Sequence, residues 1–306
     1  MASLQTVLGL LPVSGLGMIL PHEHLFTDLR GPDAPGYAQA DVRDVIRRLR
    51  PHLEELKELR VTAMVEASTG GVGRNIQVLR AVAAALDFPV VAPTGAYREA
   101  FMPATLRSRS QEELRDWMVE EISEGIEGTG VRAGFIKLAA SDEGLTALEE
   151  RLLRAAAQAA LRTGVAIASH TTVGATAVRQ VQILEEEGLD ARRFVWVHAH
   201  CEPDLQIHLR LARRGAYVEY DAIGSPDQPD SFFVGLIRRM WQGHCGTQVL
   251  LSQDAGWYQP GAEAPIRGYG YLVRTFLPSL RQAGFDTAAV DTMMVENPQC
   301  AFAIAG

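Results

Sequence analysis

The sequence has few cysteines and no long apolar run. Cys201, Cys245 and Cys300 form no CxxC pair and cannot all pair with one another, so we expect reduced thiols, as in a cytoplasmic protein. No apolar run reaches the roughly 18 residues of a membrane span. Residues 1–6 contain no basic stretch leading into an apolar core. We therefore expect a cytoplasmic protein with neither a signal peptide nor a membrane contact.

An excess of basic residues is also absent. The chain carries 29 Lys+Arg against 37 Asp+Glu, a net charge of −8. Proteins that bind nucleic acids neutralise phosphates with basic side chains, so this balance argues against a nucleic-acid partner. With 306 residues, of which 47% are hydrophobic and 22% charged, the composition is that of a globular protein and excludes disordered or collagen-like chains.

Short apolar, β-branched runs recur along the chain, and amphipathic stretches follow most of them. Apolar residues at helical spacing predict helices over four of these stretches. Gly164, Gly188 and Gly215 stand where a left-handed C-cap suits glycine. The predicted strands are Met18–His24, Val61–Ser68, Pro89–Ala96, Ala133–Ala139, Val165–His170, Phe194–Ala199, Ala216–Ala222 and Gln248–Asp254. The predicted helices are Asp41–Leu59, Leu148–Thr163, Thr176–Glu187 and Pro203–Arg214.

This alternation predicts an α/β fold with a parallel sheet covered by helices. Right-handed crossovers and eight units favour closure into a (β/α)8 TIM barrel, which we expect as a single domain over residues 1–306. An open, doubly wound sheet is the alternative. The glycine-rich residues 70–75 do not match the GxGxxG fingerprint that would support it, so the barrel is favoured.

Reactive side chains fall at the ends of the apolar runs, where a TIM barrel builds its active site. They are His22, His24, Lys137, His170, His198, Asp221 and Asp254. His22 and His24 are two residues apart, so their side chains point to the same face of a strand. Zinc, cobalt, manganese or iron would accept the nitrogen and oxygen ligands offered by His22, His24, His170, His198 and Asp254. Five ligands exceed the needs of one tetrahedral catalytic site, so we predict two divalent ions that need a bridging ligand.

Lys137 is the odd member of this set. An ammonium beside two dications would be repelled, and burial at a strand end adds a desolvation cost. The lysine would therefore be neutral, or it would react with CO₂ to give a carbamate. A carbamate is an anionic ligand with two oxygens and would supply the missing bridge. A plain salt bridge with a carboxylate is the simpler alternative.

The other histidines have different surroundings in the sequence. His52, His208 and His244 fall on predicted helices or a turn, and we expect them to be surface or capping residues. His200 shares strand parity with His198 but lies further into the loop. We expect it to support a neighbouring ligand rather than to bind metal.

Together these residues resemble the phosphotriesterase family of the amidohydrolase superfamily, which includes the phosphotriesterase-like lactonases. The resemblance runs nearly end to end. Its most specific segment is residues 125–137 (GIEGTGVRAGFIK), which ends at Lys137. It also covers residues 21–25 (PHEHL), residues 94–97 (TGAY), residues 163–165 leading to His170-Thr171, then His198, Gly215, Asp221, Asp254 and Asn297-Pro298.

The resemblance implies roles for these residues. His22, His24 and Asp254 would bind the more buried ion, and His170 and His198 the more exposed one. Carbamylated Lys137 would bridge both ions, with zinc as the expected metal.

The resemblance also implies a hydrolytic reaction at this centre. Asp254 would accept a proton from the attacking hydroxide, and Tyr97 would line the pocket beside the bridge, so these two are the expected catalytic residues. The activity implied is hydrolysis of a lactone, an ester or a phosphate triester. We further expect a homodimer.

Two departures from the family bear on the substrate. Ala222 stands where the family commonly has a histidine or arginine that reaches the substrate, and residues 255–260 are shorter than the long lid of some members. Both argue against long-chain acyl-homoserine lactones. Trp257 and Tyr258 would line an apolar pocket together with Tyr97; the alternative is that they are loop aromatics with no role in the pocket.

We therefore expect a lactonase or esterase with a small-molecule lactone or ester substrate and promiscuous organophosphate hydrolysis. The alternatives are a phosphotriesterase proper, a deaminase or amidase of the same superfamily, and a non-catalytic ligand-binding barrel. A bridging Lys137 favours hydrolysis through two metals over a one-metal deaminase. Metal content separates the hydrolase from the binding barrel, because about two metals per chain would support the hydrolase and none would support the binding barrel.

Overall fold

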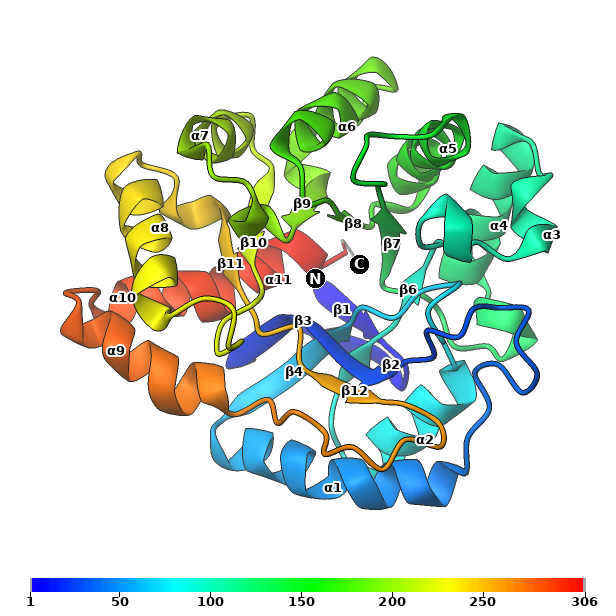
Figure 1. Ribbon diagram of the computed structural model, residues 1–306, viewed down its shortest axis with the longest axis horizontal. Coiled ribbons are helices and arrows are strands. Elements are labelled where there is room, and N and C mark those ends of the chain that lie inside the picture. Colours follow the sequence, from blue (N-terminus) through cyan, green and yellow to red (C-terminus); the bar gives the residue numbers. More distant parts are fainter. Residues whose placement is uncertain (1, 305–306) are drawn as a thin grey trace.

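Parallel strands form a ring at the centre of the structure, and helices surround them (Figure 1). The computed structural model describes residues 2–304. The strands of the ring are β3 (Met18–Phe26), β4 (Val61–Glu66), β5 (Val90–Val91), β6 (Pro93–Thr94), β7 (Phe135–Ala139), β8 (Ile167–His170), β9 (Phe194–Val197), β10 (Tyr217–Tyr220) and β11 (Val249–Leu251). They pair in parallel in the orders β3-β4-β5 and β6-β7-β8-β9-β10-β11, as predicted for the TIM barrel.

Two junctions complete the ring. β5 and β6 share one strand position, interrupted at Ala92, whose carbonyl accepts the N–H of Gly134 at 2.9 Å. Between the last and first strands, the Ser252 hydroxyl accepts the N–H of His22 at 3.0 Å and lies 2.8 Å from the carbonyl oxygen of the same residue. A side chain therefore joins the end of β11 to β3 at the candidate site.

Helices cover the outer surface of the ring. They are α1 (Val42–Glu58), α2 (Ile76–Leu86), α3 (Ala104–Arg107), α4 (Gln111–Ser123), α5 (Ala147–Thr163), α6 (Gly174–Glu186), α7 (Leu205–Arg213), α8 (Asp230–Gln242), α9 (Leu277–Gln282), α10 (Thr287–Asp291) and α11 (Asn297–Phe302). The four predicted helices are confirmed as α1, α5, α6 and α7. At the start of α5, Thr146 and Glu149 cap each other reciprocally.

Local glycine conformations agree with the predicted helix ends. Gly164, Gly188 and Gly215 have φ values of 77°, 87° and 104°. These are left-handed conformations that an L side chain adopts only with strain, which is why glycine stops the helices there.

The apolar core has two layers, one inside the ring and one between the ring and the helices. Ile19, Phe135, Tyr217 and Leu250 are among the side chains that fill the inside. Because side chains alternate across a strand, the inward-facing series that starts at Tyr217 continues toward the carboxyl end of β10. The polar residues of the site therefore rest on a packed apolar floor.

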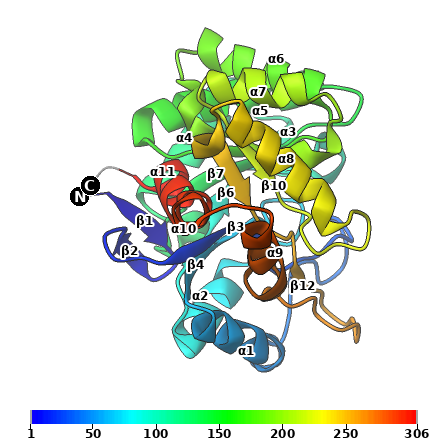
Figure 2. The same cartoon turned by 90° about the vertical axis from the view of Figure 1, so that its left-hand side faces the viewer.

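The chain ends close the other end of the barrel. A hairpin of β1 (Ser3–Thr6) and β2 (Gly9–Pro12) lies there beside the termini (Figure 2). Ser3 and Ile304 exchange backbone hydrogen bonds at 3.1 and 2.9 Å. The sequence did not predict this hairpin, nor β12 (Gly256–Tyr258), which pairs with β3, because elements this short show no periodic pattern. Within residues 2–304, no helix is long and apolar enough to cross a membrane.

Several predicted strands extended too far. The runs expected to end at Ala199, Ala222 and Asp254 end instead at Val197, Tyr220 and Leu251. Apolar residues continue into the loops that follow, so hydrophobicity alone did not mark the strand ends.

Candidate active site

All six predicted metal ligands, together with Tyr97, line one cavity of about 260 Å³. The cavity opens at the carboxyl ends of the strands, where a TIM barrel carries its active site. The strands and the loops after them supply these residues, as predicted. The candidate ligands are His22, His24, Lys137, His170, His198 and Asp254.

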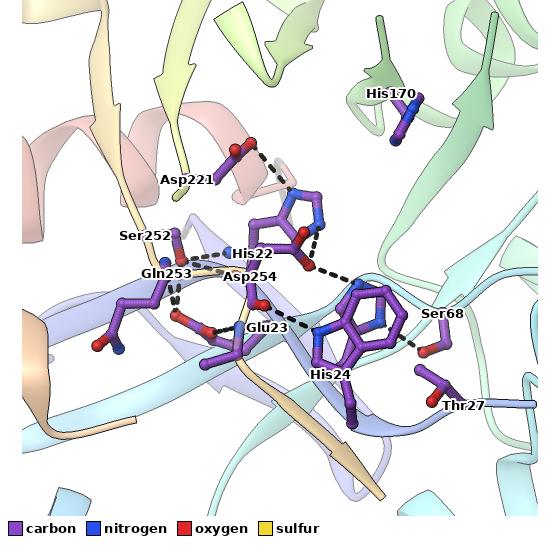
Figure 3. A network of polar contacts seen from close by, with 12 residues as sticks. His22, Glu23, His24, Thr27, Ser68, His170, Asp221, Ser252, Gln253 and Asp254 are labelled. Atoms are coloured by element: carbon purple, nitrogen blue, oxygen red, sulfur yellow. Dashed lines mark hydrogen bonds and ion pairs between the residues drawn. The ribbon is translucent and has the colours of Figure 1, made fainter. Parts of the chain in front are cut away.

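His22 and His24 project from β3 into this cavity (Figure 3). Nδ1 of His22 lies 3.3 Å from Oε2 of Glu219, and Nδ1 of His24 lies 2.7 Å from Oγ of Ser68. These contacts occupy one nitrogen of each ring. The remaining Nε2 atoms face Asp254, with Oδ1 at 3.6 Å from His22 and 3.0 Å from His24.

Asp254 is held in an unusual conformation. Its φ of 51° lies in the left-handed region, which a non-glycine residue seldom adopts and which is concentrated at functional sites. Its Oδ1 is buried and has no hydrogen-bond partner of good geometry among residues 2–304. Burial acts to raise the pKa of Asp254, but the nearby His24, which forms an ion pair with this carboxylate, outweighs burial and holds the pKa well below its usual range. The carboxylate is thus poised to bind a cation.

His198 and His170 form the other side of the centre, with ring centroids 4.3 Å apart. His198 follows β9 and has a φ of 63°. The Asp221 carboxylate accepts a hydrogen bond from the backbone N–H of His198 at 2.8 Å and also lies 2.7 Å from Nδ1 of its ring. Burial acts to raise the pKa of Asp221, but the nearby His198 outweighs burial and lowers the pKa of Asp221 to about 2. The Asp221 contact leaves Nε2 of His198 for a ligand, the usual arrangement of a metal-binding histidine.

The two sides of the centre meet at His22. Its ring lies 5.3 Å from that of His198, and ligand atoms of His22, His198 and Asp254 all lie within 4.8 Å of one another. Such an arrangement has the dimensions of a shared cation centre.

Lys137 lies on β7 and is only 3% exposed. Within residues 2–304, its ammonium forms no hydrogen bond and no ion pair with a carboxylate, which argues against the plain salt bridge. Burial lowers the pKa of Lys137 to about 8, although Glu219, Asp221 and Asp254 act in the opposite direction. A buried, unpaired ammonium is costly, so this residue fits a modified or neutral form better than a structural cation.

Three buried carboxylates at the centre were not predicted from the sequence. Glu23 accepts Ser252 Oγ–H at 2.8 Å and the N–H of Ala255 at 2.7 Å, and burial raises its pKa to about 7. Glu66 accepts the N–H of Ser68 at 2.8 Å. Glu219 lies beside His22, and its Oε1 is buried without a hydrogen-bond partner in the described part of the chain. The sequence could have indicated Glu219, because it lies two residues before Asp221 and residues two apart in a strand face the same side, here the barrel interior.

Aromatic residues line another part of the cavity. The Tyr97 hydroxyl lies 3.1 Å from Nδ1 of His170, and burial raises the pKa of Tyr97 to about 12, so it stays a proton donor. The Trp257 ring lies 4.6 Å from His24. Tyr258 does not reach the cavity, because its hydroxyl donates to Asp44 at 2.8 Å. Of the two loop aromatics considered, only Trp257 therefore lines the pocket.

The remaining histidines differ in part from expectation. His200 does not continue the strand parity of His198, because Ala199–Cys201 form a 3₁₀ turn. Its Nδ1 lies 3.3 Å from Oδ1 of Asp221, which is compatible with the supporting role that we expect. His208 is fully buried rather than a surface or capping residue. It contacts the Tyr220 hydroxyl at 3.0 Å, because its helix turns this face toward the barrel.

Comparison with known proteins agrees with this geometry. A model of the Phosphotriesterase family matches residues 2–302. The "Phosphotriesterase homology protein" of Escherichia coli K12 is 35% identical over 285 residues, covering 92% of this chain and 96% of the relative. An aryldialkylphosphatase of Saccharolobus solfataricus is 27% identical, and the match covers 93% of this chain and 94% of that relative. An N-acetyltaurine hydrolase of Homo sapiens is 26% identical, and the match covers 96% of each chain.

Solved structures give the same result for the fold. A mutant PTE-like lactonase from Deinococcus radiodurans matches with a TM-score of 0.89 and 29% identity, over 98% of this chain and all (100%) of that chain. An organophosphorus hydrolase mutant from the same organism matches with a TM-score of 0.90 and 29% identity, over 98% of this chain and 97% of that chain. The chain is a TIM barrel and belongs to the phosphotriesterase family of hydrolases.

Proposed function

We propose that this protein is a binuclear metal-dependent hydrolase and that its substrates are lactones or esters. The observation that carries the proposal is the convergence of two imidazole nitrogens on Oδ1 of Asp254, beside a buried lysine that forms no ion pair with a carboxylate among residues 2–304. His22, His24 and Asp254 would hold one ion, and His170 and His198 the other. Zinc as the metal, a cytoplasmic location and a homodimer remain predictions.

The protonation of the site supports this assignment. Burial lowers the pKa values of His22 and His170 below the usual range, so both rings are neutral, as metal ligands must be. Burial also opposes charge on His24, but Asp254 and Glu66 outweigh it and raise its pKa to about 9. A proton on His24 thus stands between that ring and Asp254 where a divalent ion would bind.

A carbamate on Lys137 completes the ligand set in this proposal. The ammonium first loses one proton; the neutral amine then attacks CO₂, a C–N bond forms and a second proton leaves, so a cation becomes an anion with two oxygens. This change removes the repulsion between an ammonium and two divalent ions. A carbamate would also be a ligand common to both ions, which the five other candidates would not provide.

The reaction follows from these positions. When bound, two divalent ions lower the pKa of a water molecule and polarise the carbonyl oxygen of the substrate. Asp254 accepts the proton of the attacking water and delivers it to the leaving oxygen. Tyr97 donates a hydrogen bond to the substrate beside His170, and the apolar wall that includes Trp257 excludes water from the rest of the cavity.

The substrate preference follows from the dimensions of the cavity. About 260 Å³ accommodates a small cyclic ester, whereas a phosphate triester needs separate space for three substituents. We expect kcat/KM for the best lactone to exceed that for a paraoxon-like triester by at least about tenfold, or ~1.4 kcal/mol. The measurement is a kinetic comparison with the same metal at the same pH. Triesters that match every lactone would favour a phosphotriesterase, the activity that the name of the S. solfataricus relative indicates.

Tyr97→Phe tests the substrate side of the site. The variant keeps the ring and removes only the hydroxyl next to His170. We expect lactone turnover to fall about tenfold, as for loss of one hydrogen bond to the reacting substrate, while metal content stays unchanged. Tyr271→Phe is the matched control, because that hydroxyl contacts Asp230 outside the cavity. Equal loss of metal and turnover in Tyr97→Phe would assign Tyr97 to the metal centre instead.

A further inference from the structure

Arg98 carries the only guanidinium among the residues that line the cavity in the described part of the chain. It follows Tyr97, and its guanidinium lies 5.9 Å from the centre of that ring. Nη2 lies 2.9 Å from Nε2 of His170. A positive charge therefore stands within one hydrogen bond of a candidate metal ligand.

A surface carboxylate fixes the guanidinium at one end. Asp142 contacts Nη1 at 3.0 Å through Oδ2 and Nη2 at 2.6 Å through Oδ1. The Thr172 hydroxyl in turn donates to Asp142 at 2.7 Å. The Asp142 side chain is 53% exposed, so this ion pair positions Arg98 without neutralising it as fully as a buried partner would.

The other edge of the guanidinium, formed by Nε and Nη2, has an incomplete set of partners. Nε of Arg98 is buried and has no hydrogen-bond partner among residues 2–304. Nη2 points its free hydrogen at His170. A neutral imidazole has one nitrogen with a free lone pair. If His170 gives that lone pair to a metal, its other nitrogen carries a hydrogen and cannot accept a hydrogen bond. Nη2 of Arg98 then has no acceptor on His170, whichever of the two ring nitrogens binds the metal.

In the metal-loaded protein, two adjacent N–H groups of Arg98, those of Nε and Nη2, therefore lack an acceptor among residues 2–304. Two parallel donors on a planar cation match the two oxygens of a carboxylate. Arg98 already makes a contact of this kind with Asp142. The apolar residues around it, such as Phe101 and Leu29, offer no competing acceptor side chain.

We propose that Arg98 binds a carboxylate carried by the substrate, so that the preferred substrates are lactones or esters of small carboxylated acids rather than neutral ones. This inference rests on the proposed function and names the substrate class of the same site. Arg98 touches the substrate away from the reacting bond and determines specificity.

A pair of lactones that differ in charge tests the proposal. The substrates are 5-oxotetrahydrofuran-2-carboxylate and the corresponding 2-carboxamide, which have the same ring and nearly the same size. The proteins are the zinc-loaded wild type, Arg98→Gln, Arg98→Lys and the control Arg192→Gln. Arg192 is 80% exposed and pairs with Asp190 away from the cavity.

We expect the wild type to favour the carboxylate by at least about tenfold in kcat/KM, a preference of ~1.4 kcal/mol. Arg98→Gln should lower this ratio at least about tenfold, and Arg98→Lys should lower it less, because lysine keeps the charge but not the fork. Arg192→Gln should leave the ratio unchanged. A ratio near one in the wild type, or an unchanged ratio in Arg98→Gln, would overturn the proposal.

Binding of the product gives a readout that does not depend on turnover. Hydrolysis of 5-oxotetrahydrofuran-2-carboxylate opens its ring and gives 2-hydroxyglutarate. Calorimetric titration with 2-hydroxyglutarate should show at least about tenfold weaker binding to Arg98→Gln than to the wild type. Equal binding would overturn the role of Arg98 even if neither lactone is hydrolysed. Two metals per chain and lactone hydrolysis without charge preference would refute only the role of Arg98. A protein that binds no metal would refute the proposed function and, with it, the release of Nη2 from His170 on which the role of Arg98 rests.

Discussion

Lys137→Ala should bind one divalent ion per chain instead of two and lose about a thousandfold in kcat/KM, equivalent to ~4 kcal/mol of transition-state stabilisation. The reason is that Lys137 is the one candidate that would be shared by both ions, and alanine leaves neither a charge nor an oxygen in its place. The barrel should still fold, because the lysine makes no hydrogen bond or ion pair with residues 2–304 that alanine would break. Metal content and lactone turnover are measured on the same preparation.

The composition of the chain provides a direct control for the carbamate. Lys57 is the only other lysine in the sequence, and its Nζ donates to the carbonyl of Leu86 on the outside of the barrel. With ¹³C-labelled bicarbonate, a carbamate signal in NMR should appear in the wild type and in Lys57→Arg and vanish in Lys137→Ala. Added acetate or propionate should restore part of the second metal and of the activity. A fully active Lys137→Ala protein with two metals would refute the bridge.

Asp254→Asn is the second variant with a large expected effect. Asparagine keeps the size of the side chain but removes the charge that faces the two imidazole nitrogens of β3. We expect turnover to fall by roughly 10²–10⁴-fold, the usual contribution of a general base, and the more buried ion to bind more weakly.

The matched control for this variant is Asp116→Asn. Asp116 lies on α4 with its side chain 58% exposed, so its loss should change neither metal content nor turnover. An Asp254→Asn protein with wild-type turnover would show that Asp254 does not transfer the proton. Unchanged metal affinity would show that it is not a ligand.

The sequence predicted the barrel, and it predicted that the candidate ligands lie close together, for a definite physical reason. Strand ends converge in this architecture, so polar residues that end apolar runs must lie together, as His22, Lys137 and His170 do. The backbone conformations of His198 and Asp254 could not be predicted in this way. Their φ values of 63° and 51° depend on contacts with distant residues, such as Asp221 for His198.

Residues that act through tertiary contacts escaped the sequence analysis. Glu219 lies within β10, whose pattern only shows that it faces inward, and its contact His22 comes from β3. Arg98 belongs to a loop, where no periodicity indicates direction, and only the folded chain brings it to His170. His208 was expected at the surface because it is polar, but it lies three residues after Leu205 and four before Ala212, on the apolar face of α7, and is buried against Tyr220.

Metal stoichiometry tests the central claim most directly. Purified protein is saturated with zinc, freed of excess metal and analysed for metal and protein in the same sample, for the wild type and for Lys57→Arg. We predict two ions per chain in both proteins, because the six candidate ligands around one cavity exceed the needs of a single site. At most one ion per chain at saturation would contradict the binuclear centre and, with it, the proposed mechanism.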